Sequence, residues 1–186
     1  MKRLAIIILL SALSLPLHSQ ERRMSVSTNL LSWAELATIN AEASFAAGRH
    51  ISVYLEGRYN PWTWKDGDPD SQFQLRQREL SAGMRYWPWF VNSGMWIAAG
   101  LQIKEYNFGG VLSRMTEEGR TAGVDFGLGY SFMLSAHWNL DLGIWGSAGY
   151  KKFKQYSCPL CARILHEGEK PFIAPDNAAI SLVYVF

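Results

Sequence analysis

Once its first 19 residues are set aside, the sequence has no apolar run long enough for a membrane-spanning helix. Such a helix needs roughly 18 or more consecutive apolar residues. Hydrophobic residues make up 48% of the 186 positions, but they are spread along the chain. Backbone polar groups must all be paired inside a bilayer, so only a closed β-sheet could span one here. Helix-bundle membrane proteins are therefore excluded.

Charge of one sign, cysteine and histidine are also scarce. The chain has 18 Lys and Arg against 16 Asp and Glu, with two cysteines and four histidines. Without the first 19 residues the charges balance at 16 each, so no basic surface of the nucleic-acid-binding kind remains. No serine stands in a G-x-S-x-G motif. We expect no cofactor and no enzymatic activity; a lipid-modifying enzyme using Ser157, His166 and Glu167 is a minor alternative.

The start of the chain has the pattern of a secretory signal peptide. Lys2 and Arg3 precede an apolar run from Leu4 to Leu15, and Pro16 and small or polar residues follow. We expect cleavage after Ser19, which gives a signal peptide over 1–19 and one domain over 20–186. No cysteine lies near this site, which argues against a lipoprotein anchor.

The last ten residues alternate polar or small residues with large apolar ones. Ile180, Leu182 and Tyr184 share one face with Phe186, the last residue. This pattern is typical of the closing strand of an outer-membrane β-barrel, a segment that barrel-assembly machinery engages. We therefore expect Phe186 to act as an assembly signal and the protein to lie in the bacterial outer membrane.

Period-two alternation recurs in segments of about ten residues, the length of a tilted membrane-crossing strand. The predicted fold is all-β: an eight-stranded antiparallel up-and-down transmembrane β-barrel. Its strands are expected at Val26–Ala34, Thr38–Ala47, His50–Asn60, Gln74–Trp87, Met95–Glu105, Ala122–Phe132, Trp138–Ala148 and Asn177–Phe186.

The predicted connections alternate in length, as bacterial barrels require. Short periplasmic turns are expected at Gly48-Arg49, Pro88–Gly94 and Leu134–His137, and outer connections at Glu35–Ala37, Pro61–Phe73, Tyr106–Arg120 and Lys151–Asp176. Aromatic residues then fall into two interfacial belts. The inner belt is predicted to hold Phe45, Tyr86, Trp87, Trp89, Phe132, Trp138, Tyr184 and Phe186, and the outer belt Trp33, Tyr59, Trp62, Trp64, Tyr106 and Tyr150.

Charged residues occupy the other face of these strands. They are Glu42, Glu56, Arg58, Glu79, Arg85, Lys104, Asp125 and Asp141. A soluble lipocalin-like barrel, the structural rival, would point apolar side chains inward and could not hold these charges around an apolar ligand. Because a lone buried ion costs several kcal/mol, we expect the charges to form an ion-pair network across the interior. An eight-stranded barrel is just wide enough for side chains to fill, so a plugged interior is favoured over a narrow channel.

Several motifs resemble those of one family of small outer-membrane β-barrel proteins of unknown function from Gram-negative gut and oral bacteria. The matching segments are Asn29-Leu30-Leu31, the strand around Glu42, Gly57-Arg58-Tyr59-Asn60-Pro61-Trp62, Arg85-Tyr86-Trp87 and Tyr106-Asn107-Phe108-Gly109-Gly110. The resemblance covers Ser27 to Phe186 and implies the outer membrane. It carries over no catalytic residue.

The predicted outer loops contain the remaining candidate sites. Cys158 and Cys161 favour a local disulfide outside the reducing cytosol, with a zinc site that adds His166 as the alternative. Trp62 and Trp64 could anchor in lipid or stack on a sugar. A lysine cluster at Lys151, Lys152 and Lys154 is expected to meet lipopolysaccharide phosphates. We therefore expect a structural or surface-interaction protein that contacts lipid and lipopolysaccharide and binds a protein or glycan through these loops.

Overall fold

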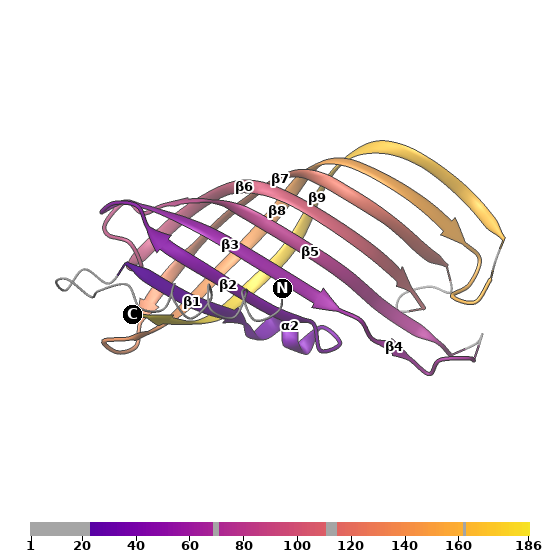
Figure 1. The fold of residues 1–186 in the computed structure, drawn as a ribbon, viewed down its shortest axis with the longest axis horizontal. Coiled ribbons are helices and arrows are strands. Elements are labelled where there is room, and N and C mark those ends of the chain that lie inside the picture. Colours follow the sequence, from indigo (N-terminus) through magenta and orange to yellow (C-terminus); the bar gives the residue numbers. More distant parts are fainter. Residues whose placement is uncertain (1–22, 69–70, 111–114, 162) are drawn as a thin grey trace, which may run out of the picture.

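The computed structural model describes residues 23–68, 71–110, 115–161 and 163–186, so the predicted signal peptide lies outside the described part. Nine strands and one short helix run in the order β1 (Met24–Asn29), α2 (Leu30–Ala34), β2 (Ile39–Ala46), β3 (Ile51–Asn60), β4 (Thr63–Trp64), β5 (Phe73–Tyr86), β6 (Gly94–Gly109), β7 (Thr116–Met133), β8 (Trp138–Tyr156) and β9 (Ile164–Val185). Figure 1 shows the strands lying side by side, strongly tilted and curved. No helix in the described ranges is long and apolar enough to cross a membrane.

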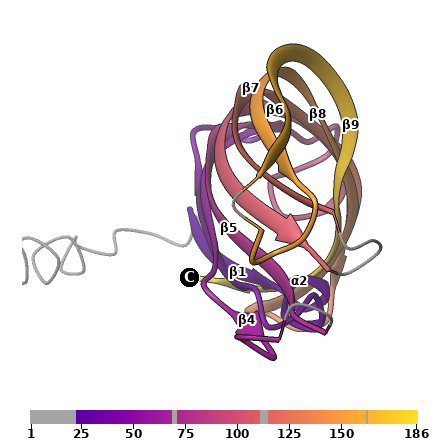
Figure 2. The ribbon, with the colours of Figure 1, turned by 90° about the vertical axis from the view of Figure 1, so that its right-hand side faces the viewer.

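The sheet closes on itself into a barrel-like ring of eight strands. β1 pairs with both β2 and β9, and β3 pairs with β5. Where these pairings exist, every strand of the ring has a partner on each side. All these pairings are antiparallel, and β4 adds two residues beside β5. Figure 2 shows the strands wrapping around a common interior, which we call the lumen. The predicted eight-stranded, antiparallel, up-and-down ring is confirmed.

Side chains alternate between the lumen and the outside, with polarity opposite to that of a water-soluble protein. In β3 every second residue is exposed, including Val53 and Leu55, while Ser52, Glu56 and Arg58 are buried. Twenty-four polar or charged residues in the described ranges are buried, against seven hydrophobic ones. Because polar groups normally lie at the surface of a folded protein, the ring has an inverted distribution, with polar side chains inside and apolar ones outside.

The first strand is shorter than the sequence predicted. β1 ends at Asn29, whose side chain accepts a hydrogen bond from the Leu31 N–H and so caps α2. The same side chain accepts a hydrogen bond from the Ile180 N–H of β9 and donates one to the Ala178 carbonyl. The prediction of a strand through Ala34 is wrong because a capping side chain replaces the strand pairing at this point.

Five strands, β5 to β9, continue past the ring, and the last four of them are the longest. β6, β7, β8 and β9 have 16, 18, 19 and 22 residues, whereas β2 has 8. The loops predicted at Tyr106–Arg120 and Lys151–Asp176 are therefore largely strand, and the prediction is wrong there. Backbone pairing continues between polar residues such as Glu117 and Gln155, since a ladder does not require apolar side chains. We call residues 73–78, 105–109, 116–121, 151–156 and 164–170 the protruding sheet, which lies at the right in Figure 1.

The last strand borders the protruding sheet and has one unpaired edge. In the described ranges β9 pairs with β1 only from Ser181 to Val185, and over Ile164 to Asn177 it pairs with β8 alone. Pro171 and Pro175 lie in this stretch. Proline lacks an N–H group and is found at sheet edges, where it hinders pairing with another strand. This edge is thus partly protected against self-association.

Candidate functional site

Arg85, the next-to-last residue of β5, is buried in the lumen and forms a paired contact with Glu42. Its Nη1 and Nη2 atoms donate to the two Glu42 carboxylate oxygens at 2.7 and 2.6 Å. Both side chains are about nine-tenths buried. The rings of Tyr54, Trp96 and Trp145 surround the guanidinium carbon at 5.1, 4.8 and 5.6 Å from their centroids. A guanidinium is weakly hydrated and stacks on aromatic faces, so these rings replace its water.

Tryptophan side chains close the lumen on one side of this ion pair. Trp87 and Trp96 are each 1% exposed with ring centroids 6.4 Å apart, and Trp145 lies 5.6 Å from Trp96. The Trp87 Nε1 donates to the Ser52 hydroxyl at 3.0 Å. Trp87 was predicted in a membrane-facing belt, which is wrong, because strand alternation with Arg85 inside and Tyr86 outside places Trp87 inside. We call these three indoles the aromatic seal.

Trp96 and Trp145 were not identified from the sequence, although a signal was present. Strand alternation places Trp96 on the same face as Gln102 and Lys104, and Trp145 on the same face as Asp141. Each therefore shares the face that the charges had already assigned to the lumen.

A second ion-pair network lies nearer the protruding sheet. Arg58 contacts Glu56 at 2.8 Å, Glu79 at 3.4 Å and Asp176 at 3.3 Å. Lys104 contacts the same Glu79 and Asp176 at 3.0 and 3.3 Å. Asp176 was missed because the sequence placed it in a loop, whereas β9 contains it opposite a register shift at Trp145 and Gly146. The network thus joins strands β3, β5, β6 and β9.

The last two predicted lumen residues, Asp125 and Asp141, form no ion pair in the described ranges. The Tyr54 hydroxyl donates to Asp125 Oδ2 at 2.8 Å, and Asp141 lies opposite Ser131. The Oδ1 atom of each carboxyl has no hydrogen-bond partner among the described residues. Between the aromatic seal and the protruding sheet, the described lumen therefore holds six carboxyl groups (Glu42, Glu56, Glu79, Asp125, Asp141 and Asp176) and three cations (Arg58, Arg85 and Lys104).

A cavity of only about 20 Å³ lies beside the central ion pair. Three buried atoms on residues that line it have no partner in the described ranges: Arg85 Nε, Trp96 Nε1 and Asp141 Oδ1. This volume is enough for about one water molecule, which could hydrogen-bond to such groups. Side chains therefore fill the lumen here, as expected for a ring of eight strands.

In the protruding sheet, Glu117 is the centre of a polar cluster. It accepts hydrogen bonds from Tyr106 Oη at 2.6 Å and from Lys151 Nζ and Gln155 Nε2, both at 2.8 Å. Partial burial alone would raise the pKa of Glu117, but the hydrogen bonds from Lys151, Tyr106 and Gln155 hold it below its usual value. Burial and the Glu117 contact raise the pKa of Tyr106. Tyr106 was predicted in the outer aromatic belt, which is wrong, since its hydroxyl binds Glu117.

Because the folded-state pKa of Glu117 is depressed, its stabilising effect should be present at neutral pH and lost with acid. The loss should begin as the pH falls below the ordinary value of 4.5 and be complete below the folded-state pKa. Hydrogen exchange of the backbone amides of β7 and β8 around Glu117 should therefore accelerate in acid relative to the ring. A Glu117→Gln variant is the control and should show no such pH dependence; an equal dependence in both proteins would contradict the assignment.

On the outer face, the side chains change from apolar to charged over two residues along each strand. Leu80, Ile103, Ala122 and Tyr150 lie opposite one another on β5 to β8. Two residues further along each strand, toward the protruding sheet, a second row crosses β5 to β9 and contains Arg78, Glu105, Arg120, Lys152 and Glu169. We call these the apolar row and the charged row.

The two cysteines are joined at the tip of the β8–β9 hairpin. Cys158 and Cys161 form a disulfide with an S–S distance of 2.05 Å, so they are not available as metal ligands. Among the other predicted loop residues, Trp62 donates to the Ala37 carbonyl at 3.1 Å and Trp64 stacks on Phe73. No hydrogen bond in the described ranges joins Ser157, His166 and Glu167.

Loss of the disulfide should change the stability of the hairpin tip only. The disulfide encloses just two residues and lies beyond the ring. A Cys158→Ser/Cys161→Ser variant should unfold within about 0.5 kcal/mol of the parent protein, as for other peripheral changes. Limited proteolysis should cut the variant faster near residues 157–161 than it cuts the parent. A large loss of global stability would show instead that the tip is coupled to the ring.

The geometry defines a class: a small, closed, antiparallel barrel-like ring with a charged lumen that is filled around Arg85, and with an apolar outer surface. The chain matches the model of a family described as a protein of unknown function (DUF3575) over residues 5–186. It belongs to this family, and the predicted resemblance to a family of unknown function is confirmed. No curated protein matches the chain.

Proposed function

We propose that the protein spans a bacterial outer membrane and holds the protruding sheet above the lipid as a surface-interaction module. The inverted polarity of the ring carries this proposal. Large side chains such as Leu55, Leu101 and Leu128 are more than half exposed, while charged residues are buried. Apolar outward residues and a polar interior are what lipid around a β-barrel requires.

Strand lengths support a module that stands clear of the membrane. About 9–11 residues of a tilted strand cross a bilayer, whereas β7 and β9 have 18 and 22 residues. The excess lies beyond the apolar row, where the exposed Lys152 and Glu169 form an ion pair at 2.8 Å. Such a surface suits water and a polar partner, either a protein or a glycan.

Epitope insertion tests the position and the direction of the ring together. An epitope placed after Leu160, at the hairpin tip, should be reached by antibody on intact cells. The matched insertion between Gly48 and Arg49, at the opposite end, should be reached only after permeabilisation. Purified protein should also migrate differently on gels before and after heating. Recovery of the protein in a soluble fraction, or equal labelling at both sites, would overturn the proposal.

A narrow cation channel is the second candidate, favoured by the excess of carboxyl groups in the lumen. Six carboxyls face three cations, and Asp125 and Asp141 lack ion-pair partners within the described ranges. Because side chains fill the lumen around Arg85, we expect no steady conductance in planar bilayers. Cation-selective openings that disappear in Asp125→Asn would establish the channel instead.

A further inference from the structure

Two arginines on the outer surface of β5 lack the acidic partners that neighbouring cations have. Arg76 and Arg78 are exposed and form no ion pair with any described residue. By contrast, Arg120 contacts Glu105 at 2.9 Å and Lys152 contacts Glu169 at 2.8 Å. The Arg78 guanidinium instead lies 5.9 Å from the centroid of the Tyr59 ring.

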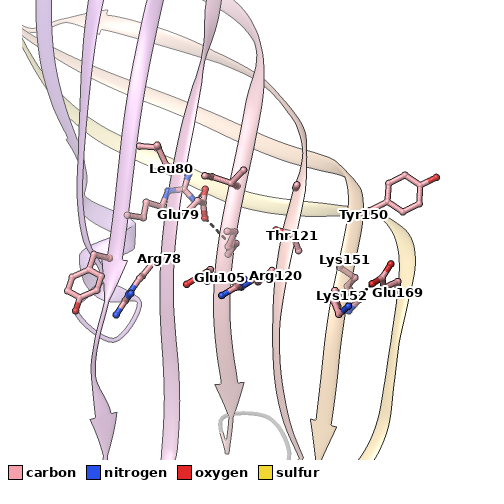
Figure 3. A pocket seen from close by; sticks show the side chains of 15 residues that line it. Arg78, Glu79, Leu80, Glu105, Arg120, Thr121, Tyr150, Lys151, Lys152 and Glu169 are labelled. Carbon is pink, nitrogen blue, oxygen red and sulfur yellow. Dashed lines mark hydrogen bonds and ion pairs between the residues drawn. The ribbon is translucent and has the colours of Figure 1, made fainter.

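Arg76 and Arg78 point outward from β5, where Asn107 and Glu105 of β6 lie directly opposite them. A hollow of about 680 Å³ at the same height lies on the other face of the sheet, in the lumen, because Arg58, Glu79 and Lys104 line it. Figure 3 shows this hollow with Arg78, Glu105 and Arg120 on neighbouring strands around it and Leu80 on the ring side of Arg78. On the outward face itself, the register places Arg78 two residues along β5 from Leu80, which lies opposite Ile103 of the apolar row.

We propose that Arg76 and Arg78 bind the phosphate of an acylated, phosphorylated lipid of the outer leaflet, whose chains lie along the apolar row. This inference rests on the proposed position of the ring in the membrane. Residues two apart on a strand share a face and lie about 6.6 Å apart, so both guanidinium groups can reach one headgroup. Arginine binds phosphate through paired N–H groups.

The nearby acids do not oppose this assignment strongly, because each already has partners. Glu105 is paired with Arg120, and Glu118 accepts a hydrogen bond from Tyr156 Oη at 2.7 Å. A soluble phosphate would use only the arginines. The step from the charged row to the apolar row instead matches the junction between a lipid headgroup and its acyl chains.

Native mass spectrometry of the protein in a zwitterionic detergent tests the site with three probes: phosphorylated lipid A, dephosphorylated lipid A and phosphatidylcholine. The parent protein should retain phosphorylated lipid A in preference to the other two. An Arg76→Ala/Arg78→Ala variant should bind it at least about tenfold more weakly, the effect of losing one charge-assisted contact. Arg120→Ala, which removes a paired cation from the same face, should change binding much less.

Equal retention of phosphorylated lipid A by the parent and the double variant would overturn the site, as would equal retention of the dephosphorylated lipid. Inorganic phosphate that competes as well as the lipid would show a site for free anions only. Heat-dependent gel migration of each variant reports whether the ring is folded. A folded, membrane-inserted ring without lipid preference would reject this inference alone, whereas a ring that fails to insert would reject the proposed function.

Discussion

Replacing Arg85 with alanine should lower the unfolding free energy by about 3–5 kcal/mol, the usual cost of removing one partner from a buried ion pair. Glu42 would remain in the lumen with its charge uncompensated, and Tyr54, Trp96 and Trp145 would lose the cation they surround. Urea unfolding in detergent micelles, followed by tryptophan fluorescence, measures the loss. Two of the three rings around Arg85 are indoles, so the signal reports directly on this layer.

Two further variants show whether the loss arises from the pair. Lys152→Ala breaks an ion pair that is about 70% exposed on both sides, and it should cost at most about 1 kcal/mol. The double variant Glu42→Ala/Arg85→Ala should cost less than the sum of its single variants, since it leaves no unpaired charge. If Arg85→Ala costs no more than Lys152→Ala, the lumen is solvated at Arg85 and the filled interior is wrong.

Replacing Leu128 with arginine should destabilise the ring by about 2–4 kcal/mol in a lipid bilayer, as for a cation facing lipid near the bilayer midplane. Leu128 is 56% exposed and lies opposite Ile97 and Ile144, near the middle of the outward apolar surface of β7. In a water-soluble ring the same exposed substitution would change stability by no more than about 0.5 kcal/mol. Urea unfolding in phospholipid vesicles distinguishes the two cases.

Leu160→Arg is the matched control for the lipid-facing substitution. Leu160 is 48% exposed but lies at the hairpin tip beside Cys161, well beyond the apolar row. Its replacement should leave stability unchanged within about 0.5 kcal/mol. If the Leu128→Arg variant is as stable as the parent protein in vesicles, the apolar outer surface is covered by something other than lipid.

Strand alternation accounts for most of what was predictable about the lumen. Because successive side chains point to opposite faces, assigning Leu55 to the outside places Glu56 and Arg58 inside. The same rule places Trp87, Trp96 and Trp145 inside, although Trp87 was predicted in a belt and the other two were not assigned to either face. Asp176 was not predictable in this way, since a register shift in β8 and β9 interrupts the alternation before it.

Other features depend on contacts between residues distant in sequence. Arg85 pairs with Glu42 across the lumen, and Asp176 joins Arg58 and Lys104. Alternation specifies only a face, whereas these partnerships follow from strand stagger around the closed ring. The cap from Asn29 to Leu31 is local, but the bonds from Asn29 to β9 are not.

By itself the sequence determined the number of ring strands, their antiparallel order and the face on which the eight predicted lumen charges lie, because these follow from a repeat of two residues. Only the tertiary structure decided which charges pair, that tryptophans seal the lumen, that the outer segments continue as a protruding sheet, and that Arg76 and Arg78 stand unpaired beside an apolar row. Each of these depends on the stagger between neighbouring strands and on the curvature of the closed sheet, and neither is encoded by any single segment of the chain.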